Sequence, residues 1–300
     1  MSKYSSWCVY MLAVSGLFVC RNVAHAQQWV PIPEVSGQDV VPVYEGWERN
    51  PDGTFDMFFG YMNRNYSEDL NIPIGQDNNM QPGGPDRGQP TYFYPRRDQF
   101  VFRVRVPKDW GEKDVVWTLT SHGRTEKAYG TLAPSWEIDE RLIVKNMGGT
   151  QRLDEVDNDQ PPTVKVDPVP PVTLPNTAKL TAYVTDDGLP KPVARRPVAS
   201  ARPTSGSDDG GGPIANAPPV TARVRLRPPQ GLSVIWVQYR GPGKVTFDPE
   251  DYQAVVGGKV TATATFSEPG TYVLRAIASD SIEQTTENVT VTVAAPASRP

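Results

Sequence analysis

In the first half of the chain, the side chains whose chemical types could bind a ligand lie between residues 76 and 90. They are Asp77, Asn78, Asn79, Asp86 and Arg87, and their oxygens and guanidinium could cradle a cation or a sugar. A loop of this length without regular structure is usually functional or ordered by its own side chains. We predict Asp86 and Arg87 as ligand-binding residues. The alternative is that these two side chains satisfy the loop backbone and each other.

Aromatic side chains could form a sugar-binding platform beside this segment. The candidates are Tyr92, Phe93, Tyr94, Tyr129 and Trp136. Aromatic residues in β-sandwiches more often fill the core, so that alternative stays open. Tyr92 and Tyr94 are the two residues of this set that we predict to contact a ligand.

The sequence contains no motif typical of an enzyme. There is no G-x-S-x-G motif, no glycine-rich phosphate loop ahead of a helix, and no His/Cys cluster with metal-ligand spacing. His122 stands between two predicted strands, where a solvated turn residue is expected. With 34 acids, neighbouring carboxylates arise by chance, and a glycosidase that uses two of them has no motif to support it. We therefore predict a protein that is not an enzyme and has no catalytic residues.

An acidic stretch followed by two prolines, residues 153–162, indicates a stiff and solvated linker. Its Asp157-Asn158-Asp159 is similar to the acidic linker between cadherin-like repeats, where calcium stiffens the joint. Calcium takes six to eight oxygen ligands, so Asp186 and Asp187, or Asp280, would have to complete the site. The metal ligands predicted here are Asp157, Asp159 and Asp187. A plain charged linker without calcium is the alternative, and no other cofactor is expected.

The first 26 residues have the pattern of a secretory signal peptide. Lys3 precedes an apolar run from Trp7 to Val19, and residues 24–26 supply the A-x-A cleavage pattern. The run is shorter than the roughly 20 residues that span a membrane, so no transmembrane segment is expected after cleavage. Lipid attachment at Cys20 is a weaker alternative. The predicted location is the periplasm, the cell surface or the extracellular space.

Removal of this segment limits the chemistry that is available to the mature chain. Both cysteines, Cys8 and Cys20, lie within it, so disulfides and thiolate metal sites are excluded. The whole chain has a formal net charge of −4, and cleavage also removes Lys3 and Arg21, which makes the mature chain more acidic. Such a protein is a poor candidate for nucleic-acid binding. The expected partner is an envelope protein or polysaccharide.

Alternating side chains predict antiparallel strands from residue 41 onward. Residues 41–48 and 54–62 flank the turn Asn50-Pro51-Asp52-Gly53, which predicts a β-hairpin. The inward-facing residues predicted for the second hairpin strand and for residues 99–106 are Phe55, Met57, Phe59, Tyr61, Phe100, Phe102, Val104 and Val106. Further strands are predicted at 70–74, 115–120 and 125–131, while 76–90 is predicted as a loop. Five to seven antiparallel strands without helices indicate a small β-sandwich.

Several sequence runs of this first part resemble a recurrent domain of exported bacterial proteins. They are YEGW, NPDGTF, GYMNRN, IPIG, GGPDRGQPT, FVFRVRVPKDWG and VVWTLTSHGRTEKAYG, and they cover roughly residues 43–138. That domain has no assigned activity. The resemblance implies an exported bacterial protein and brings no catalytic residues with it.

A second set of strands is predicted after residue 163. The alternating segments are 178–184, 223–227, 232–239, 260–266, 271–279 and 289–293. Together with a strand that begins at Thr163, they make seven short strands with turns between them, which indicates an immunoglobulin-like sandwich. The runs PPTVKVDPVPPVTLPNTAKLTAYVTDDG, IWVQYRGPGKVTFDP and TATFSEPGTYVLRAIASDS resemble the PKD/immunoglobulin-like repeats of bacterial surface proteins. This resemblance implies a buried Trp236, a corner at residues 268–272, and an extracellular spacer or protein-interaction module.

Residues 189–220 depart from that repeat pattern. Pro, Gly, Ser and Ala dominate this stretch, which predicts a disordered insertion because such a composition cannot bury a core. Its first half is basic through Lys191, Arg195, Arg196 and Arg202. It could contact an acidic envelope polymer, although a solvated insertion is the simpler interpretation.

The predicted organisation is all-β, with two β-sandwich domains in tandem. A signal peptide (1–26) precedes the first domain (27–152), the linker (153–162), the PKD/Ig-like second domain (163–295) and a short tail (296–300). The predicted function is a non-enzymatic exported bacterial protein that acts as a binding or spacer module at the cell envelope. The alternative is a carbohydrate-binding accessory module.

Overall fold

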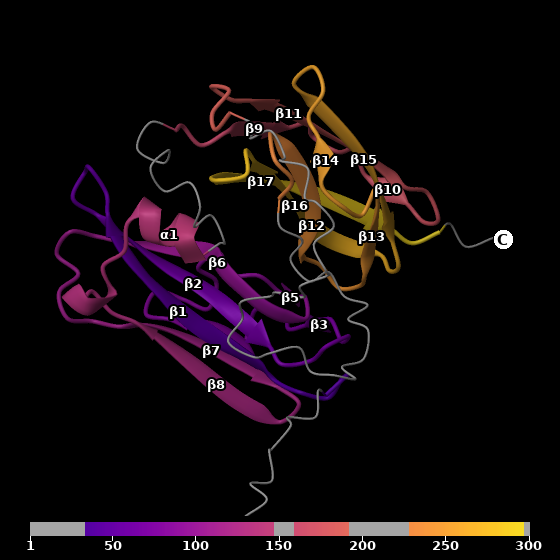
Figure 1. The fold of residues 1–300 in the computed structure, drawn as a ribbon. Coiled ribbons are helices and arrows are strands. Elements are labelled where there is room, and N and C mark those ends of the chain that lie inside the picture. The colour runs from indigo at the N-terminus through magenta and orange to yellow at the C-terminus, as the bar shows by residue number, and fades with distance from the viewer. Residues whose placement is uncertain (1–33, 147–158, 192–227, 297–300) are drawn as a thin grey trace, which may run out of the picture. The chain divides into compact units, whose positions relative to one another are not determined.

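The computed structural model describes residues 34–146, 159–191 and 228–296. The predicted signal peptide, Asp157, the strand predicted at 223–227 and nearly all of the 189–220 insertion lie outside these ranges. The described residues belong to one compact unit, and nearly all of their regular secondary structure is β-strand (Figure 1). No helix among them is long and apolar enough to cross a membrane.

The first sandwich is built from two three-stranded sheets and a short two-stranded one. One sheet has the order β1-β2-β6, the second β4-β7-β8, and β3 pairs with β5. The strands are β1 (Val40–Arg49), β2 (Phe55–Asn63), β3 (Leu70–Asn71), β4 (Asn78–Gln81), β5 (Tyr92–Phe93), β6 (Arg96–Val106), β7 (Val115–Ser121) and β8 (Arg124–Gly130).

The predicted β-hairpin is confirmed. Strands β1 and β2 pair antiparallel, with Trp47 opposite Met57. The turn between them is closed by the backbone N–H of Gly53, which donates to the carbonyl of Asn50 at 2.9 Å. Gly53 has a φ of 84°, a conformation that glycine adopts without a steric cost.

An aromatic cluster centred on Trp117 fills the core of this sandwich. The rings of Phe59, Phe93 and Phe102 lie within 6.3 Å of the Trp117 ring, centroid to centroid. Trp117, Phe59 and Phe93 are fully buried. Burial of each large side chain contributes about 1.5–3 kcal/mol, so this cluster is the main stabilising element of the first sandwich.

The structure corrects the prediction at three places in the first part of the chain. The segment predicted as a loop contains β4, because residues 78–81 pair with β7 in an antiparallel register. The prediction of no helices is also wrong, since η1 (Pro134–Trp136) and α1 (Glu140–Asn146) follow β8. The carboxylate of Asp139 accepts the N–H of Leu142 at 2.8 Å, which caps the start of α1.

Phe100 is a third correction. The register between β2 and β6 shifts between Phe59 and Tyr61, and Phe100 lies at this irregularity with a φ of 51°. A β-bulge changes the direction of the side chains beside it. The Phe100 ring is therefore only half-buried and packs against Phe58, away from the core that its neighbour Phe102 enters.

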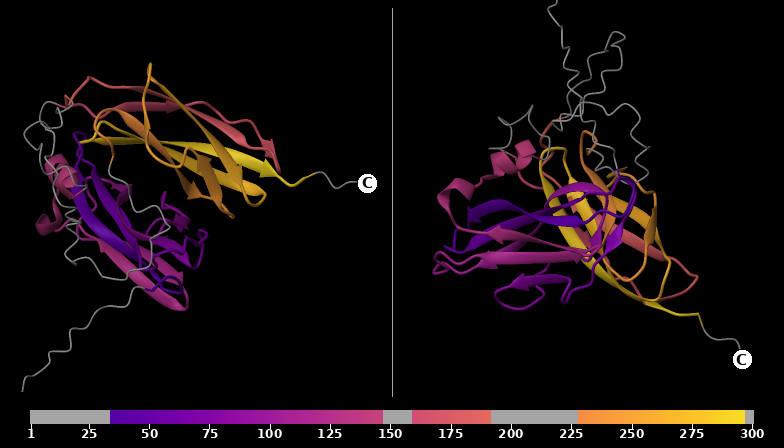
Figure 2. Two further views of the ribbon diagram at one scale, coloured as in Figure 1. Left: turned by 45° about the vertical axis from the view of Figure 1, so that its right-hand side comes forward. Right: turned by 90° about the horizontal axis from the view of Figure 1, so that it is seen from below.

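The second sandwich consists of a five-stranded and a four-stranded sheet, ordered β10-β17-β16-β12-β14 and β13-β15-β11-β9. Figure 2 shows these sheets as two facing layers. Buried side chains from both sheets form one apolar cluster. The strands are β9 (Thr163–Val166), β10 (Val172–Thr173), β11 (Ala178–Thr185), β12 (Ser233–Arg240), β13 (Val245–Asp248), β14 (Gln253–Ala254), β15 (Lys259–Phe266), β16 (Gly270–Ser279) and β17 (Gln284–Ala294).

Trp236 and Tyr272 anchor this second core. Trp236 is 1% exposed, in agreement with what the family resemblance implied. Tyr272 is fully buried, and its hydroxyl donates to the carbonyl of Glu268 at 2.7 Å. This hydrogen bond fixes the corner ahead of β16, so the turn and the core are ordered together.

Candidate metal centre

Three carboxylates converge at the end of the second sandwich where β16 turns into β17. Asp159, Asp280 and Glu283 each offer one oxygen, and these oxygens lie within 4.8 Å of one another. The exposed fractions of the three residues are 5%, 1% and 5%. Buried carboxylates are normally paired with a cation or hydrogen-bonded, so this arrangement requires an explanation.

The β16–β17 turn positions two of the three side chains. One carboxylate oxygen of Asp280 accepts the N–H groups of Ile282 and Glu283, at 2.6 and 2.8 Å. This is the local turn that aspartate commonly forms, and Ser281 takes a φ of 94° within it. Asp280 therefore holds Glu283 in place with one oxygen and keeps its second oxygen for the cluster.

Six buried carboxylate oxygens at this end of the sandwich have no hydrogen-bond partner. They belong to Asp159 (both), Glu283 (both), Asp186 (Oδ1) and Asp280 (Oδ2). Buried polar atoms are paired in the great majority of native proteins, and an orphan points to a missing water, ion or proton. The six oxygens are therefore available to a cation or, where a carboxyl is protonated, to a neighbouring carboxyl.

The pKa values of Asp159 and Asp280 show that burial, and after it the neighbouring acids, disfavours the charged form of each carboxyl. Burial, followed by the charges of Asp280, Asp187 and Asp186, raises the pKa of Asp159 to about 6. Burial also raises the pKa of Asp280 to about 6, against the lowering effect of its two backbone hydrogen bonds. The charged neighbours that act most strongly on both groups are themselves carboxylates.

Glu283 has the most perturbed carboxyl of the cluster. Burial raises its pKa to about 8, and the carboxyl of Glu140, through its side-chain contact and its charge, and the charges of Asp159 and Asp280 act in the same direction. Glu140 is the first residue of α1, so this short helix contributes an acid to the same surroundings. Such a group is neutral near pH 7 unless a cation is bound beside it.

The donor set fits calcium. Calcium takes six to eight oxygens, with carboxylates that bind through one or both atoms. The three converging carboxylates supply ligands of that type. Zinc prefers His and Cys ligands, and the three converging residues include neither. Magnesium keeps several of its waters and is bound through one or two carboxylates, so a set of three acids is more typical of calcium.

The structure brings together some of the predicted metal ligands. Asp159 lies in the cluster, and so does Asp280, which the sequence suggested as a completing ligand. Asp157 lies outside the described residues. Asp187 is exposed, and its carboxylate accepts the N–H of Leu189 at 2.8 Å. Glu283 was missed, and the one signal in the sequence was its position three residues after Asp280, between two predicted strands.

Asp86 and Arg87 do not pair with each other. Asp86 forms a two-bond ion pair with Arg240 of β12, with both N···O distances at 2.9 Å. This contact lowers the pKa of Asp86. Arg87 donates to the carbonyl of Pro82 at 2.6 Å. Both side chains therefore order the segment between residues 76 and 90, and their predicted role in ligand binding stays a prediction.

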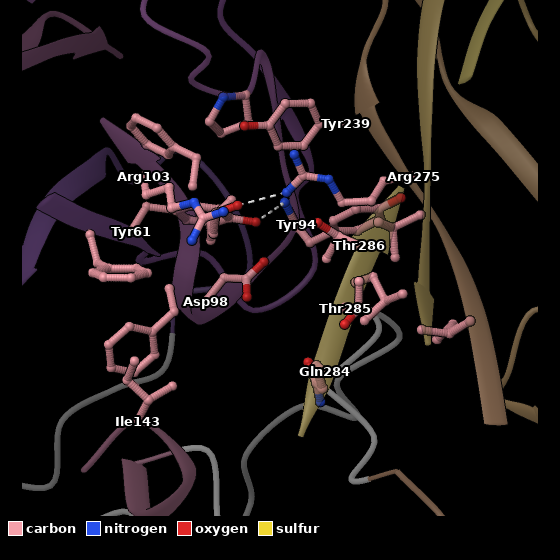
Figure 3. Close-up of a pocket in the computed structure, with 18 of the residues that line it drawn as sticks. Tyr61, Tyr94, Asp98, Arg103, Ile143, Tyr239, Arg275, Gln284, Thr285 and Thr286 are labelled. Atoms are coloured by element: carbon pink, nitrogen blue, oxygen red, sulfur yellow. Dashed lines mark hydrogen bonds between the residues drawn. The ribbon is translucent and has the colours of Figure 1, made fainter. Parts of the chain in front are cut away.

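The predicted aromatic candidates lie in different surroundings. Tyr92 is buried and its hydroxyl donates to Asp69 at 2.8 Å, while the hydroxyl of Tyr94 accepts the N–H of Gln238 at 2.9 Å. Phe93 is a fully buried core residue. Tyr129 and Trp136 are about half exposed. Tyr92 and Tyr94 line a cavity of about 710 Å³ (Figure 3), and Tyr129 and Trp136 do not.

The fold and the buried carboxylates define an all-β sandwich protein with a candidate calcium centre. No family model and no curated protein matches the chain. Among solved structures, the PKD domain of human KIAA0319 is 22% identical, with 47% of this chain and 88% of that chain covered and a TM-score of 0.24. A conjugative transposon lipoprotein from Bacteroides eggerthii is 14% identical, with 44% and 98% covered and a TM-score of 0.24. The D00-D0 domain of intimin is 11% identical, with 85% and 99% covered and a TM-score of 0.26.

Proposed function

We propose that the protein is a non-enzymatic exported module of the bacterial cell envelope, that it acts as a binding or spacer element, and that calcium stabilises it. The ion is held by Asp159, Asp280 and Glu283, with Asp186 as a fourth carboxylate. The observation that carries this proposal is the convergence of buried, unpartnered carboxylate oxygens.

The role of the ion follows from the positions of its ligands in the chain. Asp159 precedes β9, where the described part of the second sandwich begins. Asp280 and Glu283 belong to the turn between β16 and β17. A calcium ion bound to all three fixes the end of the predicted linker onto that turn. The entry point of the chain into the second sandwich then becomes rigid, as a spacer requires.

Export and the absence of catalysis are supported by the sequence. The N-terminal signal pattern and the lack of cysteine after residue 26 suit an extracytoplasmic protein. His122, the one histidine in the described ranges, occupies a turn with a φ of 47° and lies 3.3 Å from Glu68. A surface contact of this kind is a structural feature and brings no nucleophile with it.

Thermal unfolding with calcium and in metal-free buffer tests the proposal. A ligand at 100 times its dissociation constant stabilises the folded state by about 2.7 kcal/mol. For a chain of this size we expect a rise in Tm of about 5–10 °C with calcium. Asp280→Asn keeps the turn-forming oxygen but removes one negative charge from the site, so calcium should no longer raise the Tm of this variant. Asp109→Asn, at an exposed turn, should keep the rise. Equal Tm values for the unmodified protein in both buffers would refute the calcium centre.

A further inference from the structure

The cavity of about 710 Å³ has a size typical of small-molecule sites. Figure 3 shows Tyr61, Asp98 and Arg103 on one side of it, with Arg275, Gln284 and Thr285 on the other. The first group belongs to β2 and β6, and the second to β16 and β17. Two well-ordered sheets therefore form its walls.

Aromatic rings make up part of the first wall. Phe58 and Phe100 both line the cavity, and their rings meet edge to face with centroids 6.1 Å apart. The β6 irregularity places Phe100 here with a φ of 51°. A bulky residue with positive φ is rare and costs about 1–3 kcal/mol, and such residues cluster at functional sites. The strain at Phe100 is therefore a reason to look for a ligand at this ring.

Hydroxyl and amide groups make up part of the opposite wall, beside the apolar side chains of Ile235, Val237 and Ile277. Gln284, Thr285 and Thr286 are consecutive residues of β17, and all three line the cavity. Within the described ranges these three side chains form no hydrogen bonds with other residues. Their donors and acceptors can therefore serve a bound molecule at no cost to the fold.

The cationic side chains that line the cavity are already engaged with the protein. Arg103 lies 3.3 Å from Asp56, and Arg97 pairs with Glu45. Arg275 stacks over the Tyr239 ring and donates to the carbonyl of Val101 at 2.6 Å. An anionic ligand would have to compete with these contacts and would also meet the carboxyl groups of Glu48, Asp98, Glu140 and Glu283 in the same lining, so the cavity disfavours an anion.

We propose that this cavity binds a neutral oligosaccharide. A sugar ring has one apolar C–H face, which suits Phe58 and Phe100, and hydroxyl groups at its edge, which suit Gln284 and Thr286. A lipid would leave the polar wall unpaired, at a cost in affinity. The inference rests on the proposed function as a binding module and names the ligand class of its site.

The test is affinity electrophoresis of the full mature chain in gels that contain a soluble neutral polysaccharide. The probes are β-glucan, xylan, galactomannan and starch, and calorimetry with the matching hexasaccharide then gives Kd. We expect retardation by at least one probe. Phe100→Gly removes the ring and relieves the positive φ, so it should fold and should weaken binding about tenfold or more. Thr286→Val should weaken binding, whereas Thr292→Val, at an exposed position of the same strand outside the cavity, should not.

Two results would overturn this inference. One is the absence of retardation by all four polysaccharides, and the other is binding that Phe100→Gly and Thr286→Val leave unchanged. The calcium-dependent rise in Tm, measured on the same preparations, separates the two proposals. If calcium still raises the Tm but no polysaccharide binds, only the oligosaccharide proposal is rejected. Sugar binding without a rise supports the cavity and rejects the calcium centre.

Discussion

At the scale of single residues, Asp280 and Glu283 show how a short turn creates a demanding electrostatic environment. One carboxylate oxygen of Asp280 accepts hydrogen bonds from the backbone of the turn. That turn places the buried Glu283 beside other acids. Without a cation the cluster can remain buried only if it keeps protons. The free energy of unfolding of the metal-free protein should therefore change with pH in the direction opposite to that of a protein stabilised by ion pairs.

We predict that in metal-free buffer the free energy of unfolding falls as the pH rises from about 5 to about 8. The folded-state pKa values are about 6 for Asp159 and Asp280 and about 8 for Glu283, all above their ordinary values. The folded protein thus holds more protons than the unfolded chain in this window, so stability is lost as the pH rises. Urea unfolding at pH 5, 6.5 and 8 measures the effect, and saturating calcium should remove it.

A glutamine at position 283 isolates the contribution of this one carboxyl. Glu283→Gln cannot ionise, so in metal-free buffer its stability should fall less between pH 6.5 and 8 than that of the unmodified protein. In buffer with calcium, Glu283→Gln should be less stable than the unmodified protein. Glu250→Gln, at an exposed position, should follow the unmodified protein in both buffers. A stability that rises with pH in the unmodified metal-free protein would contradict this account of the cluster.

At the scale of elements, the strands with a strict two-residue alternation were predictable. In β2, Phe55, Met57, Phe59 and Tyr61 share the buried face as expected, because a register slip would expose all four. The irregularity of β6 was not predictable, since it depends on pairing with β2 and leaves the local alternation intact. Strand β4 was missed for a related reason. Its residues NNMQ have little intrinsic strand preference, and pairing with β7 orders them.

The candidate metal centre was only partly predictable. The acidic linker pointed to Asp159, and the turn Asp280-Ser281-Ile282-Glu283 looked like an ordinary connection between two strands. Only the folded sandwich brings the linker and that turn to the same place. The cavity was harder still, because its polar wall on β17 and its aromatic wall on β6 are about 185 residues apart in sequence.

Gly60 is a test of the β2–β6 irregularity. A Cβ atom at this position would collide with the carbonyl of Asp98 and the carboxylate of Glu45. We predict that Gly60→Ala lowers the free energy of unfolding by about 1–3 kcal/mol, as overpacking in a tight site does. Urea denaturation measures the change. A Gly60→Ala protein as stable as the unmodified one would show that the two strands are not this close.

At the scale of the whole molecule, residues 86–94 and β12 form a network of contacts within the compact unit. Besides the Asp86–Arg240 ion pair, the hydroxyl of Tyr239 donates to the carbonyl of Gly88, and the N–H of Thr91 donates to the carbonyl of Tyr239 at 3.1 Å. The segment that the sequence marked as a ligand-binding loop is thus engaged by the chain's own second sandwich.

We predict that Arg240→Ala weakens this network. The substitution removes both bonds to Asp86 and a hydrogen bond to the carbonyl of Gln89. Because Asp86 is about half exposed, the cost should be about 1 kcal/mol. Hydrogen exchange at the Thr91 amide should accelerate. The control is Lys244→Ala, which removes one exposed ion pair with Asp69 and should change little. Equal exchange rates at Thr91 in both variants would argue against the network.

The central claim is that buried carboxylates of the second sandwich bind one calcium ion, and a calcium titration of the metal-free mature chain by calorimetry tests it most directly. The account predicts one ion bound per chain, with an affinity reduced at least tenfold by Asp280→Asn and by Glu283→Gln and unchanged by Asp109→Asn. A titration without a binding event would contradict the account, and so would binding of equal affinity in all four proteins.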